Sequence, residues 1–385
     1  MRYLWILAVV AQLLPCPSHA DAPACTTIAE NAGKYRTREL LAAMRSDCGQ
    51  VVGDDSAAAA YITRDVMPIL WSRLMLEPLA AGFYISEIND PTAPTNFRLV
   101  LLSIAGQTRI PAVLSAVETL AANDPDVTVR RESITALGAS GLVVVFDTLI
   151  QIWASESDNE ARARVLLSLG DIGNQDIWNH AREEFARQWA RTPYNPLTPG
   201  PSPAVLTAGQ ESQLQALFAG ALNDQSYQVR IAAADAIAHR HFKRMARQLV
   251  RDLANETPAN RTPSPNTPGI LIENKMVKVR LINAVRLLGA SGQENALISF
   301  LANEHDPDVL AVGLDALGAI GSGASANLIV AALASHDDFV AMHAAMAAAS
   351  LGQTGLRADI QGRITTAQDS FAIGKMTEAA NVLAK

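Results

Sequence analysis

Histidine and acidic residues occur close together at two places in this sequence where a metal ion could bind or a proton could move. His239 and His241 are two residues apart, which on a helix points the two imidazoles to different faces, so the pair is a poor zinc site. His336, Asp337 and Asp338 could meet His343 at a turn, although a helix cap explains Asp338 better. No His-Glu-x-x-His, Gly-x-Ser-x-Gly or P-loop motif occurs. We therefore assign no catalytic, metal-binding or cofactor-binding residue and favour a function without catalysis.

Thiol chemistry is the other possibility, because the chain has three cysteines. Cys25 and Cys48 flank residues 35–44, which have a helical pattern. In an oxidising compartment such a pair forms a disulfide, and closing a loop of 24 residues would stabilise the fold by about 3 kcal/mol. Two unrelated thiols are the alternative. A bridge between Cys25 and Cys48 would leave no cysteine of the mature chain for catalysis.

Residues 1–20 have the pattern of a signal peptide, which predicts that the protein is exported. Arg2 supplies a positive charge, residues 3–14 are apolar apart from one glutamine, and the small residues before Asp21 match a signal-peptidase site. We expect a signal peptide over residues 1–20 and a periplasmic or secreted mature chain. A buried N-terminal helix is the alternative, although the prolines that follow the apolar run would end it. Lipid anchoring at Cys16 is not expected, because the small side chain required just before it is missing.

Charge and composition limit the partners and the fold class. Lys and Arg number 31 against 38 Asp and Glu, a net charge of −7, so there is no basic excess for a nucleic acid partner. Aromatic residues make up only 5% of the chain while 49% is hydrophobic, which favours closely packed helices over a β-sandwich. Residues 142–154 are strongly apolar, but the stretch is short and Asp147 interrupts it. We expect no membrane span in the mature chain.

The sequence repeats itself with a period of 32 residues. Arg98, Arg130 and Arg162 follow one another at this interval, and a glycine lies eight residues after each of them. These glycines are Gly106, Gly138 and Gly170, the arginine series continues at Arg230, and further copies carry Gly289, Gly318 and Gly352. In those later copies the arginine position falls on Leu281, Leu310 and Ala344. Chance does not produce this combination of spacing and identity.

Each copy has the pattern of a helix, a turn and a second helix. Around Arg98, apolar or small residues fall one place before it and three, four and seven places after it, which is a helical stripe. Asp124-Pro125 and residues 157–160 predict helix starts, and the repeated glycine predicts a left-handed helix end. One pair of helices cannot cover its own apolar stripe, so the pairs must stack in a row. The sequence therefore predicts an all-α fold, an α-solenoid of stacked antiparallel helix pairs.

Residues 124–130 read Asp-Pro-Asp-Val-Thr-Val-Arg, and their helix ends in Ala-Leu-Gly at 136–138. This copy resembles the short bacterial HEAT repeat, the type also found in phycobilin-lyase-like proteins, and the resemblance extends over residues 90–355. It implies that arginine and acidic side chains bridge adjacent repeats. Acidic residues lie six places before three of the arginines, at Asp124, Glu156 and Asp224. We assign these charges a structural role rather than ligand binding, because each arginine is bracketed by the apolar stripe.

The period divides the chain into four parts. Residues 1–20 form the signal peptide, residues 21–89 an N-terminal helical cap with the predicted disulfide, residues 90–355 the repeat array, and residues 356–385 a C-terminal helical cap. Proline-rich insertions interrupt the array at 192–203 and 256–269, because runs of X-Pro cannot continue a helix. Such insertions project from one face of a solenoid, and either binding or tolerated slack explains them.

These observations predict an exported, non-catalytic module for protein–protein interaction or scaffolding in the cell envelope. A protein or peptide partner would bind the concave face formed by the stacked second helices. Trp153, Trp178 and Trp189 are core residues first and candidate anchors second. The alternative is a lyase-like or chaperone-like protein that grips a small cofactor or a client in the concave groove, which requires a deep pocket with polar groups. The sequence identifies neither the partner nor the oligomeric state.

Overall fold

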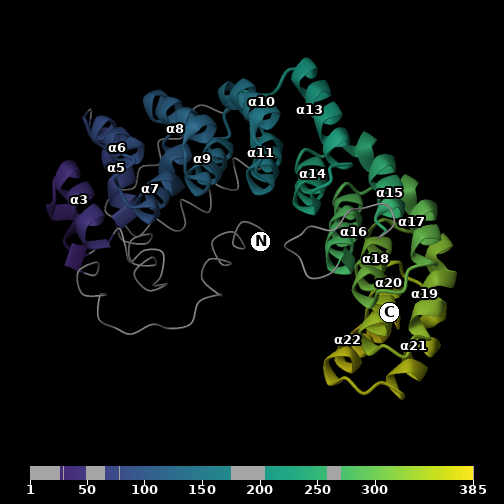
Figure 1. Ribbon diagram of the computed structural model, residues 1–385. Coiled ribbons are helices and arrows are strands. Elements are labelled where there is room, and N and C mark those ends of the chain that lie inside the picture. The colour runs from purple at the N-terminus through teal and green to yellow at the C-terminus, as the bar shows by residue number, and fades with distance from the viewer. Residues whose placement is uncertain are drawn as a thin grey trace. The chain divides into compact units, whose positions relative to one another are not determined.

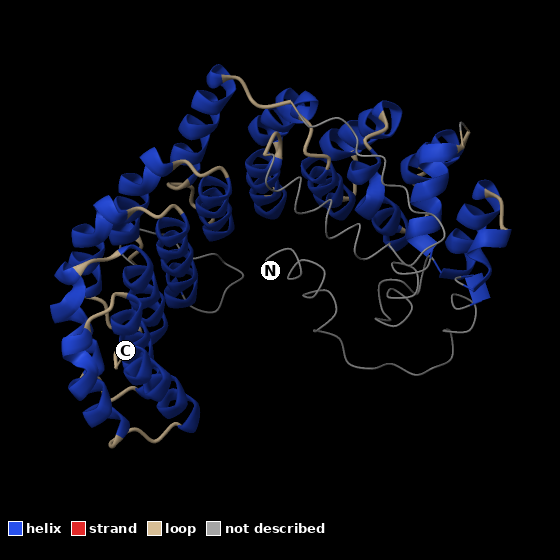
Figure 2. Ribbon diagram, turned by 180° about the vertical axis from the view of Figure 1, so that it is seen from behind, coloured by secondary structure: helices blue, strands red, loops and turns tan. Residues whose placement is uncertain are grey.

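The computed structural model describes residues 27–28, 30–48, 66–77, 79–174, 204–257 and 270–384. These residues form helices and loops without a β-strand (Figure 2), and the predicted all-α solenoid is confirmed. The predicted signal peptide, Cys25 and the insertion at 192–203 lie outside the described residues, as does the insertion at 256–269 beyond residue 257. Cys48 is described only as the last residue of a short helix, so the disulfide stays a prediction. None of the described helices combines the length and the apolar character needed to cross a bilayer.

The chain folds as two units, of which unit 1 is Met1–Leu206. Its described helices are, in chain order, η1 (Ala32–Lys34), α3 (Thr37–Ala43), η2 (Met44–Cys48), α5 (Met67–Leu76), α6 (Ala80–Asn89), α7 (Thr95–Thr108), α8 (Pro111–Asn123), α9 (Val127–Ala139), η4 (Val143–Val145), α10 (Phe146–Ser155) and α11 (Asn159–Asp171). The second helices α7, α9 and α11 pack side by side as one layer (Figure 1), and the first helices α6, α8 and α10 form the other layer. Each second helix also packs on the first helix that precedes it.

Unit 2 is Thr207–Lys385 and repeats the same arrangement. Its described helices are α13 (Ala208–Ala221), α14 (Tyr227–His239), η5 (Lys243–Met245), α15 (Ala246–Asn255), α16 (Ile270–Leu287), η6 (Ser291–Gln293), α17 (Glu294–Leu301), α18 (Pro307–Ile320), η7 (Gly323–Ser325), α19 (Ala326–Leu333), α20 (Asp338–Ser350), η8 (Thr354–Leu356), α21 (Arg357–Ile364) and α22 (Ser370–Val382). The even-numbered helices from α14 to α22 are the second helices and pack in sequence on one another. The odd-numbered helices from α13 to α21 are the first helices, and each packs on the second helix that follows it.

The predicted apolar stripe is the surface along which these helices pack. Phe97, Leu101, Leu102 and Ala105 surround Arg98 in α7, and all four are buried. Burying one leucine or phenylalanine side chain contributes about 1.5–3 kcal/mol. Because α7 packs on α6, α8 and α9, this burial exists only when neighbouring helix pairs are in place.

The helix starts differ by one or two residues from the predicted ones. Asp126, not Asp124, caps α9, since its side chain accepts a hydrogen bond from the backbone N–H of Thr128 at 2.8 Å. The Asp124 carboxylate instead accepts the backbone N–H of Asp126 at 3.0 Å and so shapes the turn before the helix. In the same way Asp158 rather than Ser157 caps α11. In both cases the cap is the residue directly before the helix, because a side-chain oxygen at that position reaches the free N–H groups of the first turn.

The prediction that Gly106, Gly138 and Gly170 end their helices in a left-handed conformation is wrong. All three lie inside their helices, and none has a positive φ. A Cβ atom placed on Gly106 would stand 1.8 Å from the carbonyl oxygen of Ala136 in the next second helix. Gly318 likewise lies inside α18 without a positive φ. The repeated glycine at this position therefore allows two neighbouring second helices to approach each other closely.

The left-handed residue lies three positions after the repeated glycine of unit 1. It is found at Arg109, Gly141 and Gly173, eleven residues after each repeat arginine. Among the described residues of unit 2, those with positive φ are His241, Gly289 and Gly352. Counting eleven residues back from the last two assigns Lys278, not Leu281, and Ala341, not Ala344, to the arginine position. The predicted alignment of these two copies is therefore wrong by three residues. It matched Gly289 and Gly352, which are left-handed, with the glycines of unit 1 that lie inside helices.

Candidate functional site

Each of three repeat arginines contacts an acidic side chain 26 residues later, in the turn of the following repeat. The pairs are Arg98–Asp124, Arg130–Glu156 and Arg230–Glu256. In the first pair both side chains are 5% exposed, and Arg98 Nε also donates to the carbonyl oxygen of Ile88 at 2.8 Å. These charges therefore lie between adjacent helix pairs rather than on a ligand-facing surface.

Arg130 contacts two turns at once. Its Nε and Nη2 atoms donate to Glu156 at 2.8 and 3.3 Å, and its Nη1 atom donates to the carbonyl oxygen of Asp124 at 3.0 Å. The hydrogen bond to Glu156 holds the pKa of Arg130 above its ordinary value. Burial acts to raise the pKa of Glu156, but the hydrogen bonds from Arg130 and from the backbone N–H of Asp158 outweigh it and lower that pKa. Both partners are thus held in their charged forms.

Arg230 and Glu256 form the corresponding contact in unit 2, and both side chains are almost fully buried. Arg230 Nη2 donates to Glu256 at 3.0 Å, and Nη1 donates to the carbonyl oxygens of Asp224 and Gln225, both at 2.9 Å. The sequence interpretation missed Glu256 because it assigned this residue to a proline-rich insertion. The spacing of 26 residues that joins Arg98 to Asp124 would have identified it.

The contact continues in α16 with a lysine in place of the arginine. Lys278 Nζ lies 2.7 Å from Glu304, which also accepts the backbone N–H groups of His305 and Asp306 at 2.9 and 3.0 Å. Burial acts to raise the pKa of Glu304, and these hydrogen bonds outweigh it and lower the pKa below its ordinary value. Sequence reasoning missed Lys278 and Glu304, although they too are 26 residues apart.

Arg162 has a different neighbour. Its guanidinium lies over the ring of Trp153, 4.4 Å from the centroid, a cation–π contact that contributes about 0.5–1 kcal/mol near a surface. Trp153 is half-buried in α10, so it serves as a packing partner here. Trp178 and Trp189 lie outside the described residues, as does the position where the same spacing would place a partner for Arg162.

The histidine cluster considered for metal or proton chemistry is not assembled. Asp338 accepts hydrogen bonds from the backbone N–H groups of Gln368 and Asp369 at 2.7 and 2.8 Å, so it joins its own turn to the next one. It does not cap its own helix as predicted. His343 pairs instead with Asp315, with 2.6 Å between Nδ1 and Oδ1. Within the described ranges no group of three His, Cys, Asp or Glu side chains is placed to hold a metal ion.

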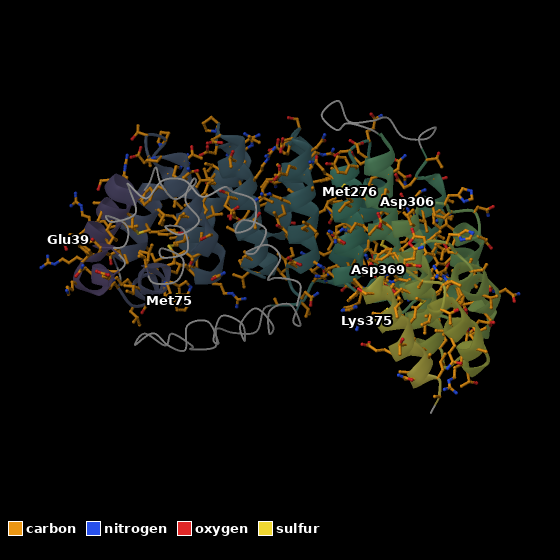
Figure 3. All side chains as sticks on the ribbon, turned by 90° about the horizontal axis from the view of Figure 1, so that it is seen from below. Glu39, Met75, Met276, Asp306, Asp369 and Lys375 are labelled. Atoms are coloured by element: carbon orange, nitrogen blue, oxygen red, sulfur yellow. The ribbon has the colours of Figure 1, made fainter. Side chains whose placement is uncertain are left out.

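One face of unit 2 exposes large apolar side chains at equivalent positions. Met276 in α16 and Phe339 in α20 each lie thirteen residues before a left-handed glycine, and Phe371 in α22 lies one repeat period after Phe339. Their exposed fractions are 45%, 44% and 66%. Met276 is labelled in Figure 3, as is Lys375, which lies one turn after Phe371. We call Met276, Phe339 and Phe371 the apolar row.

The equivalent face of unit 1 is polar. Glu132 in α9 and Arg164 in α11 each lie nine residues before a left-handed glycine, as His343 does in α20. Arg164 Nη1 donates to Glu132 at 3.1 Å and to Thr135 at 3.0 Å, and Nη2 donates to Glu160 at 3.1 Å. Exposed ion pairs of this kind contribute little to stability but keep the surface hydrated. The apolar row is therefore a property of unit 2 and not a general consequence of the repeat.

Comparison with known proteins identifies the repeat. A family profile described as HEAT repeats matches residues 86–174, and no curated protein matches the sequence. Among solved structures, an engineered protein from the Northeast Structural Genomics Consortium is 15% identical, with 94% of this chain and 99% of that chain covered and a TM-score of 0.30. Kap121p is 12% identical, with 98% of this chain and 48% of Kap121p covered and a TM-score of 0.37, so the chain spans about half the length of Kap121p. The profile match identifies residues 86–174 as HEAT repeats, and successive helix pairs of the same kind continue through the described residues of unit 2.

Proposed function

We propose that this protein is an exported, non-catalytic scaffold of the cell envelope that binds a protein partner through the apolar row of unit 2. HEAT repeats suggest a protein-interaction scaffold, because a row of stacked helix pairs presents an extended surface. The observation that carries the proposal is the exposure of Met276, Phe339 and Phe371 at equivalent positions on second helices. Support for export comes from the signal-peptide pattern of residues 1–20.

The apolar row has the features of a binding hot spot. Phe339 packs edge-on against His343, with 4.6 Å between ring centroids, and His343 is held by Asp315. Phe371 is accompanied by Lys375, whose Nζ lies 6.0 Å from the ring centroid. A side chain that is already held in place loses little conformational entropy when a partner binds. Each phenylalanine thus has polar neighbours that can form the rim of an interface around an apolar centre.

The spacing of the row favours an amphipathic helix as the partner segment. Neighbouring second helices lie about 8–10 Å apart, so Met276 and Phe371, three second helices apart, are separated by about 25–30 Å. An amphipathic helix of about 20 residues is about 30 Å long and can reach all three members of the row with one apolar stripe. The aspartate at the equivalent position of α18, Asp308, interrupts the row and pairs with Lys275 of α16, so the polar break in the row is already neutralised within the fold.

Site-specific photo-crosslinking in the producing cell tests this function. A photoreactive amino acid is placed at Phe339, at Phe371 or, as the control, at Val330, an exposed apolar residue of α19 in the first-helix layer. We expect one and the same protein to be crosslinked from positions 339 and 371 and not from 330. The double variant Phe339→Ala with Phe371→Ala should lose that protein in co-purification while keeping its melting temperature. Equal crosslinking from all three positions, or crosslinking from none, would overturn the proposal.

A further inference from the structure

A groove of about 730 Å³ opens between α15 and α17, two neighbouring first helices of unit 2. Arg247 and Arg251 line it from α15, Phe300 and Asn303 line it from the side of α17, and Lys278 reaches it from α16. Volumes of this size are typical of sites that hold small ligands or a few residues of a peptide. The groove is made mainly by first helices, so it is separate from the apolar row.

The charges that line the groove do not cancel. Lys278 pairs with Glu304 at 2.7 Å, and Glu256 pairs with the buried Arg230. The two carboxylates that line the groove are therefore neutralised within the fold. Arg247 and Arg251 are exposed and lie one helical turn apart, and among the described residues neither guanidinium contacts a carboxylate. Like charges at this spacing repel each other across one helical turn. The groove therefore presents two unopposed positive charges.

The other wall provides apolar surface and amide groups. The Phe300 ring faces Lys278, with Nζ 5.7 Å from its centroid. Asn303 Nδ2 donates to the carbonyl oxygen of Ser299 at 3.0 Å, and its Oδ1 accepts no hydrogen bond from the described residues. That oxygen can accept a peptide N–H. Gln293 lines the groove at the opposite end of α17 with a second amide side chain.

These dimensions and groups favour an extended peptide over a small anion. Gln293 and Asn303 are ten residues apart, which corresponds to about 15 Å along a helix. An extended chain covers about 3.3 Å per residue, so about four or five residues fit between the two amides. Guanidinium groups bind carboxylates through two parallel hydrogen bonds, which gives both strength and orientation.

We propose that the α15–α17 groove binds an extended acidic peptide segment. Two of its carboxylates bind Arg247 and Arg251, an apolar side chain between them packs on Phe300, and its backbone N–H groups donate to Asn303 and Gln293. This site goes beyond the proposed function. Its failure would leave partner binding at the apolar row untouched, because the two sites share no residue.

Fluorescence anisotropy with the full chain tests the groove. The probe is a labelled heptapeptide, Gly-Glu-Asp-Leu-Glu-Asp-Gly, and its matched control carries Gln and Asn in place of Glu and Asp. We expect the acidic peptide to bind and the amide peptide not to bind. The double variant Arg247→Gln with Arg251→Gln should weaken binding by at least roughly tenfold, since two charge-assisted hydrogen-bonded contacts are lost. Phe300→Ala should weaken binding of this probe but not of a probe with Gly in place of Leu.

A matched variant separates a defined site from general electrostatic attraction. Lys243→Gln with Arg244→Gln removes the same charge from two exposed cations of η5 that do not line the groove, and it should change the affinity by less than about twofold at physiological salt, where such charges are screened. Equal weakening by the two double variants would overturn the proposal. So would absence of binding by the unaltered chain, or equal binding of the amide peptide.

Discussion

Arg230 and Glu256 are joined at 2.8 Å in a place where their side chains are 2% and 0% exposed, and they connect the second helix α14 to the turn that follows α15. The pair fixes the position of one helix pair on the next. Two further hydrogen bonds join Arg230 Nη1 to the backbone carbonyl oxygens of Asp224 and Gln225. A charge buried this deeply is tolerated only with its partners present.

Removing the acidic partner should therefore be costly. We predict that Glu256→Ala lowers the free energy of unfolding by about 3–5 kcal/mol, because Arg230 remains buried without a counter-charge. Urea unfolding followed by circular dichroism measures this. As the control, Arg230→Met combined with Glu256→Leu should recover most of the loss. A loss below about 1 kcal/mol for Glu256→Ala would mean that the pair is solvated in solution and not buried.

The more exposed pair of unit 1 should show a smaller effect. Arg130→Ala removes three hydrogen bonds to Glu156 and Asp124, so we expect a loss of about 1–3 kcal/mol in the free energy of unfolding. Binding at the apolar row should be unchanged. An unchanged melting curve together with lost binding would show that Arg130 serves a ligand instead.

Acid should weaken unit 2 through Glu304. Its pKa is lowered in the folded protein relative to the ordinary value of 4.5, so near that pH the unfolded chain binds more protons than the folded one. This contribution to stability is fully present above the ordinary pKa and is lost as the pH falls through the lowered folded-state pKa. We predict that Glu304→Gln destabilises the protein at neutral pH and that the difference shrinks below about pH 4. Urea midpoints measured from neutral to acidic pH check this, and a difference independent of pH would contradict it.

The repeated glycine gives a test of close helix packing. Gly106→Ala would place a Cβ atom 1.8 Å from the Ala136 carbonyl oxygen, so α7 and α9 must move apart at a cost of about 1–3 kcal/mol or more. Gly374 in α22 is the matched control, because a Cβ atom there meets nothing within 4 Å. Gly374→Ala should instead stabilise the helix by about 0.5–1 kcal/mol. Thermal melts of both variants decide the matter, and equal shifts would refute close packing at Gly106.

Export and the disulfide are tested together on protein isolated from the producing cell. We expect N-terminal sequencing to begin at Asp21, and mass spectrometry without reduction to find Cys25 and Cys48 joined in one peptide pair. Cys48→Ser should lower the melting temperature to the value that a reducing agent produces in the unaltered protein. A chain that keeps Met1, or two free thiols in the exported protein, would contradict the prediction.

The repeat and its solenoid fold could be predicted from the sequence because a periodic core leaves a periodic pattern. The buried stripe of Phe97, Leu101, Leu102 and Ala105 was found by counting from Arg98. The role of the glycines could not be found in this way. Gly138 and Gly289 occur in the same pentapeptide, Leu-Gly-Ala-Ser-Gly, yet one lies inside a helix and the other has a φ of 60°. Tertiary packing decides between these two states, and the local sequence does not.

The ionic contacts were only partly accessible to the same reasoning. An acidic residue six places before an arginine is near it in sequence, but Arg130 pairs with Glu156 in the next repeat and reaches only a backbone carbonyl of its own turn. Glu256 was missed because it was assigned to the proline-rich insertion at 256–269. Lys278 was missed because the repeat was defined by an arginine, and this copy has a lysine at that position. The apolar row was missed because exposure cannot be read from hydrophobic periodicity when a helix is apolar on more than one face.

The buried charge pairs between adjacent helix pairs have a structural role, the apolar row has the proposed role in binding, and one paired measurement tests this separation. Melting temperature and affinity for the protein crosslinked at position 339 are measured for Glu256→Ala and for Phe339→Ala with Phe371→Ala. The first variant should lose stability and, at a temperature where it is folded, keep its affinity. The second should lose affinity and keep its melting temperature. Loss of affinity in the first with full affinity in the second would contradict the account.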